Sequence, residues 1–466
     1  MTDDLFSESR QGLRTSLYLA LSVLQSGLAC SLDVYLASVF TPFIMLDLQL
    51  IRDNPSYVRE SLAKKKFHCD FELFLELDQK RREALKKAED KRCLQKKASD
   101  AIASLDKKSE AFLSEVKAMK AMAEEVKTLE KEAHVIELAW EEVYLTLPNI
   151  PHPSVPLGHR PEDSPVVATL GDIDSISAFA KPHYDIPNFD RGVDFARGSK
   201  VSGAGFPFYA GDCAKLVRAL LQFFLDEAEE GGYEMLMPPI VVNEASARAT
   251  GQLPDKEGMM YFDSAEGLYL IPTAELPVTN FFRDEIIEEA QLPLKRAAYT
   301  PCFRREAGSW GKDVRGLNRL HQFDKVELVK WTAPEESFKE LESLRLDAEK
   351  LLQKLELPYR VLSICAGDMG FTHSKQYDLE VWAGGQKRWL EVSSCSNFTS
   401  FQAHRAKIRY RSSTTQKLEY VHTLNASALA IPRVLAALLE NNLCENGSVR
   451  MPAALKPWFK KDFLVF

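Results

Sequence analysis

Several common signatures of metal binding and nucleotide binding are missing from this 466-residue sequence. Its eight cysteines never form a C-x-x-C pair, so we expect neither a zinc site nor a dithiol redox motif. No predicted strand leads into G-x-G-x-x-G, and G-x-x-x-x-G-K-[ST] is absent, which excludes the two commonest phosphate-binding loops. Scattered cysteines of this kind suit a reducing compartment, and we expect a cytoplasmic protein.

Charge is absent from Thr15–Leu32, which is rich in leucine. This stretch has three interpretations: a signal peptide, a short membrane anchor, or a leader that precedes the true start. Acidic residues before the stretch and Asp33 after it weaken the two targeting interpretations. Met45 begins "MLDLQLIRDNP", which resembles the opening of a domain. We therefore expect residues 1–44 to be a leader of unknown role, and no membrane function.

Neither proline nor glycine occurs between Glu72 and Leu147, where Lys, Glu, Ala and Leu dominate, as in long helices. Apolar residues recur at steps of four and three, the heptad pattern of a coiled coil. A reversal near Ser104–Glu110 predicts an antiparallel two-helix arm, on the order of 50 Å long, within a domain of residues 45–150. The predicted seam comprises Leu77, Leu85, Ala88, Ala98, Ala101 and Leu105, then Phe112, Val116, Met119, Ala123, Val126, Ala133, Ile136, Trp140, Val143 and Leu147.

Basic residues are concentrated on the first helix of this predicted arm. Lys80–Lys97 holds nine of them against three acidic residues, although the whole chain has a formal net charge of −8. A solvated coiled-coil face is one explanation, and an oligomerisation coiled coil is another. The local excess favours a surface that contacts a phosphate backbone. The residues predicted to make that contact are Lys80, Arg81, Lys86, Lys87, Lys91 and Arg92.

A proline-rich linker, Leu147–Gly158, separates the arm from a second predicted domain, residues 151–466. The pattern there predicts three helices, Asp212–Glu230, Ala333–Lys354 and Leu429–Asn441. Strands that meet through short loops, with helices between them, indicate an α+β fold with a mainly antiparallel sheet. The predicted strands are Glu234–Met237, Gly267–Ile271, Leu294–Phe303, Lys325–Trp331, Tyr359–Ile364, Lys375–Trp382 and Arg388–Ser393.

Charged side chains follow one of these strands directly. In "CFRREAGSWGKDVRGLNRLHQFDKVEL", Arg304 and Glu306 are two residues apart and so share a face of an extended chain. A guanidinium group can form paired hydrogen bonds with a phosphate or carboxylate, and a carboxylate can accept from an amino group. Phe323 offers a ring on which a base can stack, although a phenylalanine on a strand, taken alone, is more typical of a core.

Three further segments carry polar groups at predicted strand or helix ends. Thr273 and Glu275 follow the strand in "LIPTAELPVTN". Glu391 and Ser394 end another strand and offer hard oxygen ligands suited to Mg²⁺. Arg433 lies at the start of an apolar helix, where its charge opposes the helix dipole and an anion would compensate.

Taken together, the order and spacing of these segments resemble those of the bacterial-type seryl-tRNA synthetases, a family of class II aminoacyl-tRNA synthetases. The resemblance extends from Met45 to about Pro457. "GYEMLMPPIVV", the arginine-bearing segment above, and "LNASALAIPRVLAALLENN" are similar to the three motifs of that class, and "TGQLP" and "LIPTAELPVTN" to the serine-specific subfamily. The implied fold is an antiparallel sheet of six to seven strands behind a helical arm.

The resemblance also implies an activity: ATP-dependent attachment of L-serine to tRNA(Ser), and to tRNA(Sec), through seryl-adenylate with Mg²⁺. The implied protein is a homodimer, and its arm binds tRNA. The serine pocket would comprise Thr273, Ala274, Glu275, Glu327 and Ser427. ATP would be bound by Arg304, Arg305, Glu306, Phe323, Glu391, Val392, Ser393, Ser394 and Arg433, with Glu391 and Ser394 as the Mg²⁺ ligands.

The third motif departs from the commoner family pattern, because Ala426, Ala428 and Pro432 replace three glycines. Two alternative functions remain open from sequence. A ligase that transfers the amino acid to a carrier protein would share the catalytic motifs but lack the long arm. An inactive RNA-binding relative would have lost Arg304, Glu391 or Arg433, and all three are present.

Overall fold

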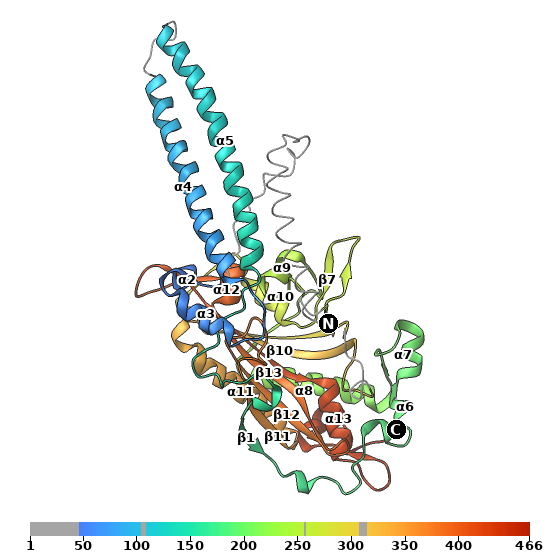
Figure 1. Cartoon of the computed structure of the whole chain (residues 1–466). Coiled ribbons are helices and arrows are strands. Elements are labelled where there is room, and N and C mark those ends of the chain that lie inside the picture. The colour runs from blue at the N-terminus through green and yellow to red at the C-terminus, as the bar shows by residue number, and fades with distance from the viewer. Residues whose placement is uncertain (1–45, 104–108, 256–257, 307–314) are drawn as a thin grey trace, which may run out of the picture. The chain divides into compact units, whose positions relative to one another are not determined.

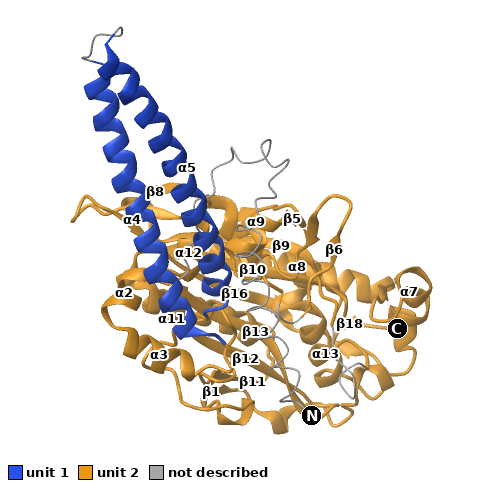
Figure 2. Ribbon diagram, turned by 45° about the horizontal axis from the view of Figure 1, so that its top comes forward, with its two compact units in different colours: residues 1–43, 69–147 blue, residues 44–68, 148–466 orange. Residues whose placement is uncertain are grey.

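The computed structural model describes residues 46–103, 109–255, 258–306 and 315–466. It divides them into two compact units, residues 69–147 and a larger unit of residues 46–68 and 148–466 (Figure 2). The predicted leader, residues 1–44, lies outside the described residues. In the described part of the chain, no helix is both long enough and apolar enough to cross a membrane. The predicted boundary at residue 150 stays a prediction.

The smaller unit is an arm of two antiparallel helices, as predicted (Figure 1). They are α4 (Phe71–Ile102) and α5 (Glu110–Tyr144), and each begins with a side-chain cap, from Asp70 and from Ser109. These caps satisfy backbone N–H groups that have no partner within the helix. Most of the predicted turn, including Leu105, lies outside the described residues.

The seam of α5 is confirmed, but part of the predicted seam of α4 is wrong. Val126, Ala133 and Trp140 of α5 are buried, whereas Leu85 and Ala101 of α4 are exposed. The heptad positions of α4 run through Leu77, Arg81, Ala84, Ala88 and Lys91, all of them at least partly buried. Two of these are basic residues, whose long aliphatic stems can cover a seam while their charged ends pair at its edge. A pattern search restricted to apolar residues therefore missed them.

The larger unit is built on an eight-stranded sheet with the strand order β1-β11-β12-β13-β16-β10-β9-β4. All neighbouring pairs are antiparallel except β4 with β9, so the predicted class is confirmed, with more strands than the six or seven expected. The strands are β1 (Val166–Leu170), β4 (Glu234–Leu236), β9 (Leu294–Phe303), β10 (Gln322–Thr332), β11 (Tyr359–Ser363), β12 (Lys375–Ala383), β13 (Arg388–Thr399) and β16 (His422–Ala430).

Both faces of this sheet are buried. Ala297 and Leu328 belong to one apolar core, and their chain neighbours Ala298 and Val329 belong to another, as the alternation of a strand requires. The first core includes side chains of α8 (Gly211–Glu230), α11 (Ser337–Lys354) and α13 (Ile431–Asn441). The second includes side chains of α9 (Glu244–Ala249), α10 (Glu275–Thr279) and α12 (Phe401–Ala406).

Smaller elements complete this unit. The helices are α2 (Leu48–Asp53), α3 (Pro55–Ala63), α6 (Phe189–Gly192), α7 (Phe195–Ser202) and α14 (Lys456–Phe459). The minor sheets pair β5 (Val241–Asn243), β7 (Leu268–Leu270) and β6 (Phe262–Asp263); β15 (Leu418–Tyr420), β14 (Arg409–Arg411) and β8 (Ile286–Glu288); β2 (Val193–Asp194) with β3 (Phe208–Tyr209); and β17 (Val449–Arg450) with β18 (Phe463–Leu464).

Candidate active site

One cleft brings together residues from three distant segments of the sequence. Arg304, Glu391 and Arg433 all line the same cleft. Arg304 follows β9, Glu391 lies on β13, and Arg433 lies in the first turn of α13. Of the other predicted ATP-binding residues, Glu306, Phe323, Val392 and Ser393 also line it. The cleft therefore has three guanidinium groups, from Arg304, Arg319 and Arg433, together with two carboxylates and one aromatic ring.

The first arginine is stacked on the predicted base platform. The guanidinium carbon of Arg304 lies 5.3 Å from the centre of the Phe323 ring. Glu306 has a left-handed backbone (φ 48°), and its carboxylate pairs with Arg319 at 3.0 Å. Arg305 differs from its neighbours, because its side chain is exposed and is not part of the cleft lining.

In the same cleft, Arg433 contacts Glu391 in two ways. One of its N–H groups donates to the Glu391 carbonyl oxygen at 2.7 Å, and the two charged groups approach to 3.7 Å. Ser394 is not part of the cleft lining, and its hydroxyl lies 3.4 Å from that of Ser396. Asp378 of β12 pairs with Ser394 in the sheet register. Desolvation and the nearby charge of Glu391 raise the pKa of Asp378 well above its usual value.

Beside the cleft, two buried carboxylates share one set of partners. Asn425 donates its amide to Glu275 Oε2 at 2.8 Å and to Glu327 Oε1 at 3.1 Å. Gln402 donates to the other Glu275 oxygen at 2.6 Å. Lys325 pairs with Glu327 at 2.6 Å and donates to the Thr273 hydroxyl at 2.9 Å. The result is a closed polar network of two negative charges and one positive charge.

This network meets the cleft through two residues, since Lys325 and Ser427 line the cleft as well. Ser427 is paired with Glu327 across β10 and β16, and its hydroxyl lies 3.5 Å from the Glu327 carboxylate. Ala274 is fully buried next to Thr273, where α10 begins. The residues predicted to bind the substrate serine thus form one compact group next to the cleft.

Burial and the neighbouring Glu327 carboxylate raise the pKa of Glu275 to about 7. The direction follows from two effects, because a low dielectric and a like charge both disfavour ionisation. Hydrogen bonding from Gln402 and the charge of Lys325 act in the opposite direction and limit the shift. A cation brought into this pocket would favour the ionised form of Glu275.

Four site residues were missed by sequence reasoning. Lys325 and Asn425 each lie two positions before a predicted residue, Glu327 and Ser427, so the two-residue period of a strand could have identified them. Asp378 faces Ser394 only because β12 pairs with β13. Gln402 comes from α12, and no local signal in the sequence relates it to Glu275.

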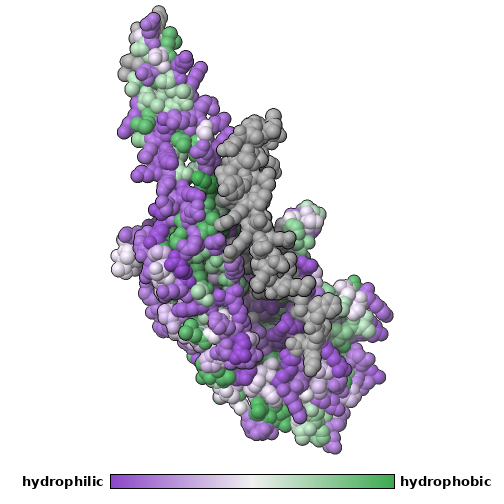
Figure 3. Space-filling view, viewed as in Figure 1, coloured by the Kyte–Doolittle hydropathy of each residue, from purple (hydrophilic) through white to green (hydrophobic). Residues whose placement is uncertain are grey.

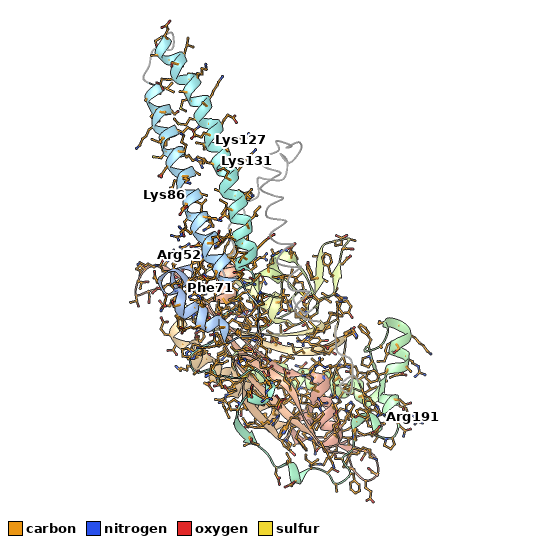
Figure 4. All side chains as sticks on the ribbon, viewed as in Figure 1. Arg52, Phe71, Lys86, Lys127, Lys131 and Arg191 are labelled. Atoms are coloured by element: carbon orange, nitrogen blue, oxygen red, sulfur yellow. The ribbon has the colours of Figure 1, made fainter. Side chains whose placement is uncertain are left out.

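The basic residues of the arm divide into two groups. Arg81 pairs with Glu137 at 2.9 Å and lies 4.4 Å from the Trp140 ring centre, and Lys91 pairs with Glu125 at 2.6 Å. Arg92 and Lys80 also have acidic partners, in Glu130 and Glu76. Lys86 and Lys87 are exposed, and Lys86 projects from α4 in Figure 4 as Lys127 and Lys131 do from α5. The visible surface of the arm is largely hydrophilic (Figure 3).

Two family models match this chain. The model described as "Seryl-tRNA synthetase N-terminal domain" matches residues 45–151, and that described as "tRNA synthetase class II core domain (G, H, P, S and T)" matches residues 261–442. Curated relatives named serine–tRNA ligase include proteins of Salinibacter ruber, 50% identical over 418 residues, and of Bacillus cytotoxicus, 54% identical over 416 residues. Both alignments cover 89% of this chain and 98% of the relative.

Solved structures agree with these relatives. The crystal structure of a seryl-tRNA synthetase from Pyrococcus horikoshii, complexed with ATP, is 36% identical and superimposes with a TM-score of 0.82. That similarity covers 90% of this chain and 99% of the other.

Proposed function

Because this chain belongs to the seryl-tRNA synthetases, and so attaches serine to tRNA at the expense of ATP, we propose that the cleft described above is where seryl-adenylate forms. In the first step, the serine carboxylate attacks the α-phosphorus of ATP and pyrophosphate leaves. In the second, the 3′-hydroxyl of the terminal ribose of tRNA attacks the adenylate and AMP leaves.

The observation that carries this proposal is the convergence of Arg304, Glu391 and Arg433 on one cleft. The first step moves no difficult proton, so the protein has to align the two substrates and offset the charge that develops on phosphate oxygens. Arg304 is placed to bind the α-phosphate, and Arg433 the opposite end of the triphosphate. Phe323 offers the ring for adenine once Arg304 turns from it toward phosphate, and Glu306 an acceptor for the adenine amino group.

The buried network beside the cleft supports the choice of serine. Glu327 and Ser427 present oxygens to the substrate hydroxyl, and Thr273 and Glu275 lie where its ammonium would balance the excess negative charge. Alanine would leave these buried groups unpaired, at a cost of about 1–3 kcal/mol for each group. Threonine has to be excluded by its extra methyl group.

Glu391 is the residue best placed to hold Mg²⁺, whose charge would offset that of the phosphate oxygens. The raised pKa of Asp378 follows first from its burial and then from the nearby charge of Glu391, which a bound cation would offset. Ser394 is the weaker part of the proposed pair, since its hydroxyl faces Ser396 and Asp378 rather than the cleft. Arg433 would act by orienting Glu391, since it donates to the Glu391 carbonyl oxygen.

We assign tRNA binding to the arm. Double-stranded RNA is recognised largely through its shape and backbone, which suits a long helical hairpin with exposed lysines such as Lys86 and Lys87. Arg81 and Lys91 form ion pairs between α4 and α5, so their main role is to stabilise the packing of these two helices. Recognition that avoids the anticodon would admit tRNA(Sec) as well as tRNA(Ser), and we propose both as substrates.

We further propose a cytoplasmic homodimer. The segment resembling the first class II motif carries Met237, which is 99% exposed. Val241 and Phe262, on the edge strands β5 and β6, are also exposed. Large apolar side chains exposed in this way are typical of a protein surface that is covered by another copy.

The test is amino-acid-dependent exchange of pyrophosphate into ATP, measured with each of the twenty amino acids. We expect exchange with serine and essentially none with alanine or threonine. Glu327→Ala should abolish it at ordinary serine concentrations, because the pocket loses its acceptor and leaves Lys325 without its partner. Normal exchange by this variant would remove Glu327 from the serine pocket, and exchange with another amino acid would overturn the proposal.

A further inference from the structure

A second buried polar network lies next to the cleft. Its central residues, Glu440, His183 and Gln386, are not among the predicted site residues. Its centre is Glu440, near the end of α13, whose side chain is fully buried. Its Oε1 accepts from the backbone and Nδ1 nitrogens of His183 and from the Gln386 amide, at 3.1, 2.7 and 2.7 Å. Its Oε2 accepts from the backbone N–H groups of Gly385 and Gln386, both at 3.0 Å.

These contacts fix the charge of Glu440. A carboxyl that accepts from N–H groups on both oxygens is ionised, because a protonated oxygen would place its own hydrogen against a donor. Burial of an unpaired carboxylate is costly, and hydrogen bonds to it are the way in which that cost is offset. The network therefore needs all three of its segments, α13, the β12–β13 turn and residues 183–185, to stay in place together.

His183 links Glu440 to the segment that follows the arginine-bearing loop. The N–H of Leu317 donates to His183 Nε2 at 2.9 Å. Since Nε2 accepts, the ring proton is on Nδ1, where it points at Glu440, and the imidazole is neutral. Gly316 permits the approach, because it has a φ of 73° and a Cβ there would lie 2.1 Å from His183 Nε2.

The same segment forms a wall of the cleft. Leu317, Asn318 and Arg319 all line it. The Asn318 amide donates to Gln386 at 2.8 Å, and the Asn318 carbonyl accepts from Arg433 Nε at 3.1 Å. Two chains of hydrogen bonds therefore lead from Glu440 to the cleft, one through His183 to Leu317 and one through Gln386 and Asn318 to Arg433.

We propose that His183 and Gln386 are positioning residues for ATP: held by Glu440, they fix the segment Leu317–Arg319 and, through Asn318, the guanidinium of Arg433. Neither residue lines the cleft, and neither is placed to touch substrate. The inference rests on the proposed role of Arg433 in ATP binding. It goes beyond the three class II motifs, because His183 lies in "KPHYDIP", outside all of them.

Two substitutions of His183 separate the two halves of its role. In His183→Asn the amide nitrogen takes the place of Nδ1, so the hydrogen bond to Glu440 is kept and the acceptor for Leu317 is removed. In His183→Gln the amide oxygen reaches the place of Nε2, so the acceptor is kept and the donor to Glu440 is removed. We expect both variants to raise the KM and Kd for ATP about tenfold with the KM for serine within about twofold, because each breaks one of the two links between Glu440 and Leu317.

Gln386→Met tests the second chain and keeps the hydrogen bond between His183 and Glu440, and we expect a similar loss of ATP affinity. His422→Asn is the matched control, because His422 bonds to Ser337 at 2.8 Å between β16 and α11, outside the network. Binding of ATP by calorimetry, without serine, is measured beside pyrophosphate exchange and thermal unfolding. If the wild type binds ATP but shows no serine-dependent exchange, the proposed function fails while the affinities still test this inference.

A purely structural role predicts a different result. The midpoint of thermal unfolding would then fall in both histidine variants, and the ATP affinity of the folded protein would be unchanged. The proposal is overturned if His183→Asn, His183→Gln and Gln386→Met all bind ATP as the wild type does. Should His183→Asn fail to fold, Gln386→Met decides the question on the same measurements.

Discussion

Glu275 shows how much of this site depends on the surroundings of single side chains. Its carboxylate is enclosed, lies beside a second carboxylate, and is held by the amides of Gln402 and Asn425. Burial first, and the neighbouring Glu327 carboxylate second, raise its pKa, and a carboxyl group perturbed in this way next to a cleft is a candidate functional group.

This raised pKa predicts a pH dependence of stability. The pKa of Glu275 is about 7 in the folded protein and about 4.5 in the unfolded chain, so the folded state holds more protons between these values. The free energy of unfolding should therefore fall as pH rises from about 4.5 to 7, by on the order of 2–3 kcal/mol, and then level off.

Glu275→Gln removes this titration. Urea unfolding of the wild type and the variant at pH 5 and pH 8 gives the difference directly, and contributions of other groups cancel. We expect the free energy of unfolding of the variant to increase relative to that of the wild type as pH rises, whatever the stability of the variant at pH 5. An equal difference at the two pH values would show that Glu275 is already ionised in the folded protein at pH 5.

At the scale of elements, the arm shows that a basic residue can serve two purposes. Arg81 and Lys91 were predicted to contact RNA, but both lie at heptad positions of α4 and pair with acidic residues of α5. Their stems fill the seam where an apolar residue was expected. Lys86 and Lys87 are exposed and lie outside that seam, so these two lysines are the better candidates for binding phosphate.

The substitution of both Lys86 and Lys87 by alanine should weaken tRNA binding and spare serine-dependent pyrophosphate exchange. The slope of log affinity against log salt should fall by about one for each lysine–phosphate pair that the substitution removes. Filter binding across a salt series measures both quantities. Arg81→Met is the comparison, and we expect it chiefly to lower the thermal stability of the arm. An unchanged salt slope in the double variant would move the RNA-binding surface elsewhere on the arm.

At the scale of the whole molecule, the fold brings the ends of four strands to one place and leaves an apolar surface uncovered. A methionine that is 99% exposed is unusual for a lone subunit of this size, because its burial would gain roughly 1.5–3 kcal/mol. The proposed homodimer explains it.

Met237→Asp should therefore shift the protein toward the monomer at micromolar concentration, which sedimentation equilibrium would detect. A charge buried against a partner copy costs far more than the same charge in water. Leu346→Asp is the matched control, because Leu346 is also exposed, on α11, and belongs to a different part of the sequence. A dimer that survives Met237→Asp with unchanged affinity would place the interface on another surface.

Features that depend on local order along the chain could be predicted from the amino acids alone. Heptad spacing predicted the helices of the arm, and the predicted strands Leu294–Phe303 and Lys375–Trp382 match β9 and β12 nearly to the residue. Arg304 directly follows β9, as predicted, but Glu391 and Ser394 do not end a strand, because β13 continues to Thr399. The resemblance to a family then added roles to these positions. β16 was missed as a strand, because its small residues resemble the start of the helix that follows.

Which of these residues act together was decided by the folded chain. Gln402 reaches Glu275 from α12, Asp378 faces Ser394 through the pairing of β12 with β13, and His183 meets Glu440 across more than half of the large unit's sequence. Such contacts depend on strand order and helix packing, which no local period encodes. They also set the pKa of Glu275 and the charge of the buried network, because desolvation and hydrogen bonding are properties of the assembled chain rather than of any one segment.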